Sequence, residues 1–306
     1  MGGSNSKEIQ HPPVPLLLEE PWKTLDWDKR DEMKENLKGF QISHSDVKHL
    51  RILVHGPVGA GKSSFINSID SIFQGRMTTG AIAEATAGHS FTKMYKIHKI
   101  KDGQYGAYLS FVFGDVMGLE RGNSEGVQTE DLKKILTGHI KEGYVFNPAS
   151  PSLEKDHNKD PGLNEKIHCL VSVIPADTLL WCADGDKISD HAMREKDAAF
   201  IQKIKDVRAY ASILGIPQVV ILSKVDESCA VVNKNIREIY SSKTIYERIK
   251  HCSHNVGVPE YCIFPVKNYH QENCLHNDMD VILLSALTNI LNFANDYVAE
   301  IPKEED

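Results

Sequence analysis

Apolar residues in this chain gather in short runs that alternate with stretches of helical periodicity. The apolar runs predict buried strands at residues 50–56, 108–115, 167–176, 218–226 and 261–266. The run at 167–176 is rich in β-branched residues, which favour strands. Residues 91–100 alternate imperfectly between apolar and polar side chains, as expected for an edge strand.

Helical spacing separates these predicted strands. An apolar face predicts a helix over 62–73, another from Phe200 to Leu214 that ends at Gly215, and a long C-terminal helix over 279–298. Strands that alternate with helices predict an α/β fold of three layers, a mostly parallel sheet with helices on both faces.

The chain divides into two parts of different character. Residues 1–47 are predicted to form an N-terminal arm and a short charged helix over 28–40 that stops at Gly39. Residues 48–306 are predicted to form one α/β domain. Within it, 74–90 and 143–165 are Gly-, Pro- and Ser-rich loops, and loops this long are usually functional or disordered.

Composition narrows the function classes. The 306 residues are 41% hydrophobic and 25% charged, which excludes a disordered chain, a coiled coil and a collagen-like fibre. The net charge of −7 makes nucleic acid an unexpected partner. The chain has six cysteines, no apolar run of 18 residues and no apolar core in its first ten residues, so we expect a cytoplasmic protein without a disulfide framework.

A phosphate-binding loop follows the first predicted strand. The segment matches G-x-x-x-x-G-K-[ST], with a buried strand before it and a helix after it. Glycines allow the backbone N–H groups to turn towards a phosphate, the lysine reaches the β- and γ-phosphates, and the serine hydroxyl binds Mg²⁺. The predicted phosphate-binding residues are Gly56, Pro57, Val58, Gly59, Ala60, Gly61, Lys62, Ser63 and Ser64.

Two further motifs stand at the ends of predicted strands. Asp115-Val116-Met117-Gly118 is a D-x-x-G motif, in which Asp115 would hold Mg²⁺ through water and Gly118 would offer its N–H to the γ-phosphate. Ser223-Lys224-Val225-Asp226 follows the T/N-K-x-D pattern with serine in the first place. The Asp226 carboxylate can accept hydrogen bonds from both N1–H and N2–H of guanine, and the Lys224 stem can lie across the base.

The remaining base contact has two candidates. Lys267 and Asn268 follow the last predicted strand, at a carboxyl end of the sheet, where ligands bind in such folds. Ser285-Ala286-Leu287 spells a more familiar motif but lies in a helix-like apolar run, so we favour Lys267 and Asn268.

These segments together resemble the interferon-induced protein 44-like family over about residues 48–300. The resemblance rests on the following segments: GPVGAGKSSFINS, SFTKMYKI followed by KDG, FGDVMGLE, YVFNP, KIHCLVSVI, LSKVDE and ILLSALTNIL. It implies a P-loop GTPase fold, GTP or GDP with Mg²⁺ as ligands, a cytoplasmic location and a role in interferon-induced antiviral responses. It also implies that a threonine near Thr92 closes over Mg²⁺ and the γ-phosphate, with Thr79 and Thr86 as competitors.

The residue after D-x-x-G bears on catalysis. Ras-like GTPases place there a glutamine that positions the attacking water, whereas this chain has Leu119, and Val58 adds a branched side chain to the loop. We therefore expect slow hydrolysis unless a homodimer or an activating protein supplies catalytic groups. The alternative is a GTP-binding scaffold or sensor with negligible turnover. An ATPase is disfavoured because SKVD is present and L-S-G-G-Q is absent.

Two weaker signals remain. Met1-Gly2-Gly3-Ser4-Asn5-Ser6 fits the N-myristoylation pattern, and one acyl chain on Gly2 would give weak, reversible membrane contact. A His- and Cys-rich region over 251–276 lacks the paired spacing of a zinc finger, so we expect no zinc there.

Overall fold

The structure is a computed structural model. It describes residues 16–81, 94–103, 105–119, 126–147, 152, 157–178 and 191–303, with side chains from residue 198 onward in the last range. The predictions for Gly2, Thr86 and Thr92 lie outside the described residues.

The described residues form a six-stranded mixed sheet. Its strands are β1 (Leu50–His55), β2 (Lys96–Lys101), β3 (Tyr108–Asp115), β4 (Cys169–Pro175), β5 (Gln218–Ser223) and β6 (Ile263–Pro265). Their order is β2-β3-β1-β4-β5-β6, and only β2 runs antiparallel to its neighbour. Because β1 lies between β3 and β4, the connections that leave these strands run to opposite sides of β1. In open α/β sheets, ligands bind at the carboxyl ends of the strands where the strand order reverses in this way.

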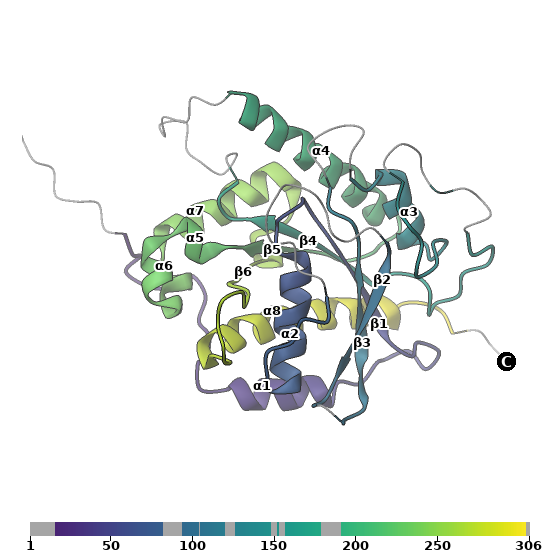
Figure 1. Cartoon of the computed structure of the whole chain (residues 1–306), viewed down its shortest axis with the longest axis horizontal. Helices are drawn as coiled ribbons and strands as arrows, with labels where there is room; N and C mark the ends of the chain where they lie inside the picture. Colours follow the sequence, from purple (N-terminus) through teal and green to yellow (C-terminus); the bar gives the residue numbers. More distant parts are fainter. Residues whose placement is uncertain are drawn as a thin grey trace, which may run out of the picture.

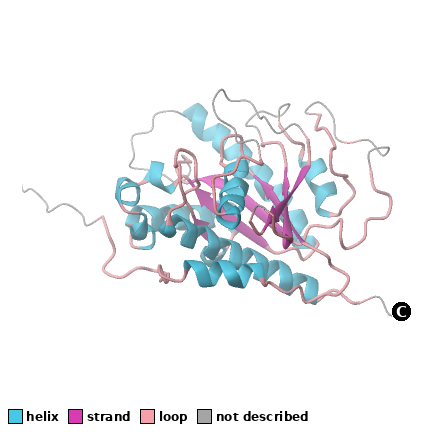
Figure 2. Ribbon diagram, turned by 60° about the horizontal axis from the view of Figure 1, so that its bottom comes forward, coloured by secondary structure: helices cyan, strands magenta, loops and turns pink. Residues whose placement is uncertain are grey.

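Helices cover both faces of the sheet (Figure 1). One face carries α1 (Arg30–Lys38), α2 (Lys62–Gln74) and α8 (Asn277–Ala299), and the other carries α3 (Thr129–Leu136), α4 (His191–Ile213) and α7 (Lys243–Cys252). Figure 2 shows the helices packed around the sheet. The short elements are α5 (Val225–Ser228), α6 (Ala230–Lys234), η3 (Ile236–Tyr240), η4 (Ser253–Gly257) and η5 (Glu260–Cys262). The three-layer, mostly parallel α/β fold expected from the pattern is confirmed.

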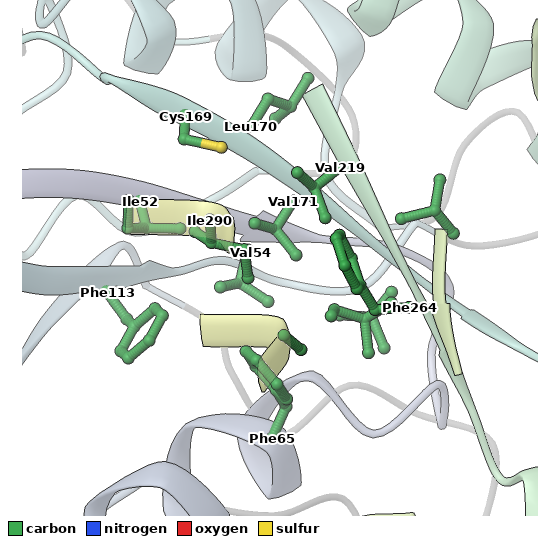
Figure 3. Close-up of a cluster of buried hydrophobic side chains, with 14 of the residues drawn as sticks. Ile52, Val54, Phe65, Phe113, Cys169, Leu170, Val171, Val219, Phe264 and Ile290 are labelled. Carbon is green, nitrogen blue, oxygen red and sulfur yellow. The ribbon is translucent and has the colours of Figure 1, made fainter. Parts of the chain in front are cut away.

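The core lies between the sheet and its covering helices. Phe65 of α2 meets Phe113 of β3 edge to face, with 6.1 Å between ring centroids, and Ile290 of α8 lies beside Ile52 and Val54 of β1 (Figure 3). The helix α8 is long and apolar enough to cross a membrane, but it is mostly buried inside the protein. Its apolar composition is therefore that of a core helix.

Some predicted boundaries are wrong. The strand expected over 218–226 ends at Ser223, because Lys224 takes a left-handed conformation (φ 58°) and α5 begins at Val225. The strand expected over 261–266 shortens to β6, because η5 occupies its first residues. The helices α3 and α7 were not predicted. In α7 the buried Ile245, Ile249 and Cys252 carry the helical spacing that could have identified it.

Residues 142–144, in the first part of the second long loop, pack against the edge of the sheet. The Tyr95 N–H donates to the Tyr144 carbonyl at 2.8 Å, and the Gly143 N–H donates to the Tyr95 carbonyl at 2.8 Å. The Glu142 carboxylate accepts from the Ile97 N–H at 3.0 Å. This part of the loop therefore protects the open edge at β2.

Candidate functional site

The loop between β1 and α2 has the backbone of a phosphate-binding loop. Gly56 has φ 146° and Gly61 has φ 90°, conformations that residues with a side chain rarely adopt. A Cβ on Gly56 would lie 2.1 Å from the Val173 carbonyl oxygen, so the loop also needs glycine for close packing on β4. The helix α2 then begins at Lys62, and its first N–H groups face the same space.

Two side chains at the start of α2 are buried in this loop. The Lys62 ammonium donates to the Pro57 carbonyl at 2.9 Å, and the side chain lies inside the loop. The Ser63 hydroxyl donates to Asp115 Oδ2 at 3.0 Å. The structure therefore joins the P-loop serine to the aspartate of D-x-x-G, the two described residues predicted to hold Mg²⁺.

The D-x-x-G segment is tied to the P-loop through the backbone. Leu119 N–H donates to the Gly56 carbonyl at 2.9 Å, and Val58 N–H donates to the Leu119 carbonyl at 3.3 Å. A Cβ on Gly118 would lie 2.6 Å from Val58 Cγ2 and 2.9 Å from Val58 N. The Leu119 side chain is fully buried in the core, so it does not face a bound phosphate.

His98 of β2 is a residue near this site that motif reasoning missed. Its Nε2 lies 3.9 Å from Asp115 Oδ2. Burial, together with the nearby Lys96, lowers the pKa of His98 to about 4, so the imidazole is neutral at pH 7. The only sequence signal was its place in an edge strand, because antiparallel pairing puts β2 beside the end of β3.

The S-K-x-D segment after β5 also contacts the P-loop. The Ser223 hydroxyl donates to the Ala60 carbonyl at 2.6 Å. Lys224 is the one described non-glycine residue with a positive φ, and such strain collects at functional sites. Asp226 Oδ2 lies 3.8 Å from Lys267 Nζ, and the side chain of Asp226 is 10% exposed.

Residues 266–276, which we name the base loop, approach from the other side. Asn268 Nδ2 donates to the Gly61 carbonyl at 3.1 Å, while Asn268 Oδ1 is buried and has no hydrogen-bond partner among the residues that the structure describes. The competing motif at Ser285 lies inside α8, where the side chain is buried. The structure therefore places Asn268, and not Ser285, against the P-loop.

Glu272 holds the base loop in shape. Its carboxylate accepts from the N–H groups of His270 at 3.0 Å and Gln271 at 3.2 Å, and from Lys267 Nζ at 3.0 Å. Burial raises the pKa of Glu272, but these hydrogen bonds outweigh it and lower the pKa to about 2. Glu272 was not predicted, and its role depends on how the loop folds back on itself.

One cavity of about 350 Å³ joins these parts. The described residues that line it are Gly59, Gly61, Lys62, Ser63, Ser64, Lys224, Asp226, Glu227, Asn268, His270 and Gln271. The other described residues predicted for the site are not part of this lining: Gly56, Pro57, Val58, Ala60, Asp115, Gly118 and Lys267. Residues predicted to bind phosphate and residues predicted to contact the base therefore line the same cavity.

The expected zinc-free character of 251–276 remains a prediction. Among the described residues, no group of three or more His, Cys, Asp or Glu side chains is arranged to hold a metal ion.

The strand order, the P-loop after β1 and the D-x-x-G motif after β3 define a P-loop GTPase fold. The chain is 31% identical over 281 residues to human interferon-induced protein 44-like, and 30% identical over 279 residues to human interferon-induced protein 44. These alignments cover 91% and 90% of this chain and 59% of each relative, so the chain spans about three-fifths of their length. The resemblance to this family is confirmed, although no family model matches.

Solved structures with a similar shape are more distant. Toc33 from Arabidopsis thaliana in complex with Mg²⁺ and GMPPNP is 16% identical, with a TM-score of 0.44 over 88% of this chain and 92% of that one. A structure of the chloroplast translocon components atToc33 and psToc159 is 14% identical, with a TM-score of 0.41 over 92% and 98%. Both scores are low, so the fold assignment rests on the strand order and the P-loop.

Proposed function

We propose that this chain binds GTP or GDP with Mg²⁺ and hydrolyses GTP slowly unless a second copy or an activating protein contributes. The observation that carries the proposal is the Ser63–Asp115 hydrogen bond at 3.0 Å, which joins the P-loop to D-x-x-G. Beside it, one cavity contains Lys62 at the phosphate end and Asp226 and Asn268 at the base end. Guanine offers two donors that a single carboxylate can accept, and adenine does not.

The residues present fit both ligands. Ser63 Oγ and the Asp115 carboxylate are hard oxygen ligands that can hold Mg²⁺ directly or through water. Mg²⁺, when bound, neutralises phosphate charge. The Lys62 ammonium contacts the Pro57 carbonyl, and Lys62 is the first residue of α2. A β-phosphate bound at this helix N-terminus would accept a hydrogen bond from the ammonium.

Slow hydrolysis follows from Leu119. Its side chain is buried in the core and carries no hydrogen-bonding group, so it cannot orient an attacking water. Ras-like domains that have the glutamine but no activating protein turn over at about 10⁻⁴ s⁻¹. We expect the isolated monomer to be no faster.

Nucleotide titration of the purified protein tests the proposal. GTP and GDP should bind in Mg²⁺, and ATP should bind far more weakly. Lys62→Ala should abolish or strongly weaken nucleotide binding, because the phosphates lose the ammonium group of the P-loop. Equal affinity for ATP and GTP, or unchanged GTP affinity in Lys62→Ala, would contradict the proposed nucleotide site.

A GTP-binding scaffold or sensor with negligible turnover is the second candidate, favoured by the same buried Leu119. Single-turnover hydrolysis measured against protein concentration separates the two. A rate that rises with concentration indicates a GTPase completed by a second copy. A rate that stays near zero at every concentration, with or without cell extract, indicates a scaffold.

We also propose an antiviral role in the cytoplasm, and the names of the two human relatives support induction by interferon. Induction of the transcript by interferon and a higher virus yield after gene disruption would support it. Weak membrane contact through Gly2 would show as an added acyl mass and as loss of a membrane-bound fraction in Gly2→Ala. Unchanged virus yield after gene disruption would contradict the antiviral role. An intact mass without an added acyl chain would contradict membrane contact through Gly2.

A further inference from the structure

The base loop is anchored from inside the protein by the residue next to Asn268. Tyr269 is buried, and its N–H donates to Ser68 Oγ of α2 at 2.9 Å. Its hydroxyl donates to Asp280 Oδ1 at 2.6 Å and accepts from the His276 N–H at 2.7 Å. Both ends of the loop therefore meet at one tyrosine hydroxyl.

Asp280 connects this tyrosine to the N-terminal part of the chain. It lies in the first turn of α8, is fully buried, and uses its second oxygen, Oδ2, to accept from Arg30 Nε of α1 at 2.7 Å. A buried carboxylate needs a partner of opposite charge, and Arg30 supplies it. In Figure 1, α1 and α8 lie side by side on the face of the sheet that also carries α2.

A continuous set of contacts therefore runs from α1 to the P-loop. It passes from Arg30 to Asp280, from Asp280 to Tyr269, and through the adjoining Asn268 to the Gly61 carbonyl. We propose that α1 controls nucleotide retention through this set, with Arg30 and Asp280 as positioning residues for the base loop. The inference rests on the proposed guanine-nucleotide site and adds a regulatory input to it.

A second contact, separate from the one between Arg30 and Asp280, also joins α8 to other parts of the chain. Arg237 makes a two-pronged contact with Asp278, at 2.8 Å and 3.0 Å, and its guanidinium lies 5.6 Å from the Trp27 ring centroid. This second contact also holds the N-terminal segment on α8, and among the described residues neither of its two charged side chains forms a hydrogen bond or ion pair with the base loop. Asp278→Asn is therefore a matched control for changes at Arg30.

The test is a double-mutant cycle between Arg30→Met and Tyr269→Phe. Two readouts are measured: hydrogen exchange of amides 266–276 without nucleotide, and the release rate of labelled GDP. Arg30→Met should speed both by about tenfold, which corresponds to about 1.4 kcal/mol. In the Tyr269→Phe background, which lacks the linking hydroxyl, the same change should add little.

Controls separate coupling from general destabilisation. Melting temperature should fall in Arg30→Met with or without Tyr269→Phe, and Arg30→Lys should restore part of the base-loop protection. Asp278→Asn should lower the melting temperature while leaving base-loop exchange and GDP release unchanged.

Two results would overturn the inference. One is a lower melting temperature in Arg30→Met with base-loop exchange unchanged, and the other is additive effects in the double variant. If the wild type binds no nucleotide, the proposed function fails, whereas the exchange measurement still decides whether α1 and the base loop are coupled.

Discussion

At the residue scale, the site depends on a few polar side chains that reach backbone atoms of the P-loop. Ser223 occupies the place where related motifs have asparagine or threonine, and its short side chain still donates to the Ala60 carbonyl at 2.6 Å. Asn268 makes the second such contact, to the Gly61 carbonyl. The segments predicted to contact the base are therefore held against the P-loop by direct hydrogen bonds.

Asp226→Asn should change base preference. The substitution replaces one acceptor oxygen with an NH₂ donor, so guanine loses one charge-assisted hydrogen bond, contributing roughly 1.5–3 kcal/mol, and meets a donor instead. We expect at least a tenfold weaker GTP affinity. XTP should gain relative to GTP, because xanthine has a carbonyl where guanine has its amino group.

The measurement is competition of GTP, XTP and ATP against a labelled guanine nucleotide. Glu247→Gln, an exposed carboxylate on α7, is the matched control and should leave all three affinities unchanged. An unchanged GTP/XTP ratio in Asp226→Asn would mean that residues 223–226 are only a strand-exit loop.

At the element scale, the loops after β1 and β3 form one unit. A parallel bridge joins Pro57 to Leu119, and Gly118 packs directly against Val58. A movement of the D-x-x-G segment must therefore move the P-loop as well. The structure explains in this way why glycine is needed at 118, independently of any contact with a phosphate.

Gly118→Ala should disturb the P-loop. The new Cβ would lie 2.6 Å from Val58 Cγ2 and 2.9 Å from both Val58 Cα and N, and backbone atoms cannot rotate away. Such overpacking typically costs about 1–3 kcal/mol, so stability should fall and GTP affinity should drop. Urea unfolding and nucleotide titration measure the two effects.

Two comparisons make this prediction specific. Gly80→Ala, where a Cβ would meet nothing within 4 Å, should change neither stability nor affinity appreciably. Adding Val58→Gly to Gly118→Ala removes the Cγ2 clash but not the backbone clash, so recovery should be partial. Full recovery, or no loss in Gly118→Ala itself, would contradict the packing argument.

At the scale of the whole molecule, burial keeps three histidines neutral. Burial, then Lys62 and Arg208, lower the pKa of His55 to about 3. Burial also dominates at His98 and His168, whose pKa values fall to about 4. At these three positions the unfolded chain, with histidine pKa values near 6.5, therefore binds up to three more protons than the folded protein below pH 6.5.

The free energy of unfolding should accordingly decrease as pH falls from 6.5 towards 4. Stability changes with pH in proportion to the extra protons of the unfolded state, so three histidines contribute at most roughly 4 kcal/mol per pH unit. The range above pH 4.5 isolates the histidines. Glu272, whose pKa is lowered to about 2, reduces the free energy of unfolding only as the pH falls below that range.

Urea midpoints between pH 7 and pH 4.5 measure this slope. His98→Gln should lower the slope by the contribution of about one proton, because one of the three buried imidazoles is then absent. Stability that stays constant over this range in the wild type would show that the three imidazoles take up protons in the folded protein over the same pH range as in the unfolded chain.

The sequence alone determined those features that neighbouring residues create together. The P-loop could be predicted because consecutive glycines and the start of α2 produce its shape locally. The strands β1, β3, β4 and β5 were predictable because continuous apolar runs are buried in a parallel sheet. The place of Asp226 in the cavity was predictable from its position after such a run, and its contact with guanine stays a prediction.

The tertiary structure decided everything that joins distant segments. It placed Asn268 rather than Ser285 beside the P-loop. It also buried the Leu119 side chain in the core and brought His98 next to Asp115. The link from Arg30 through Asp280 to Tyr269 has no local signal at all. Such contacts form only when strand order brings remote loops to one edge of the sheet, and local pattern carries no information on that order.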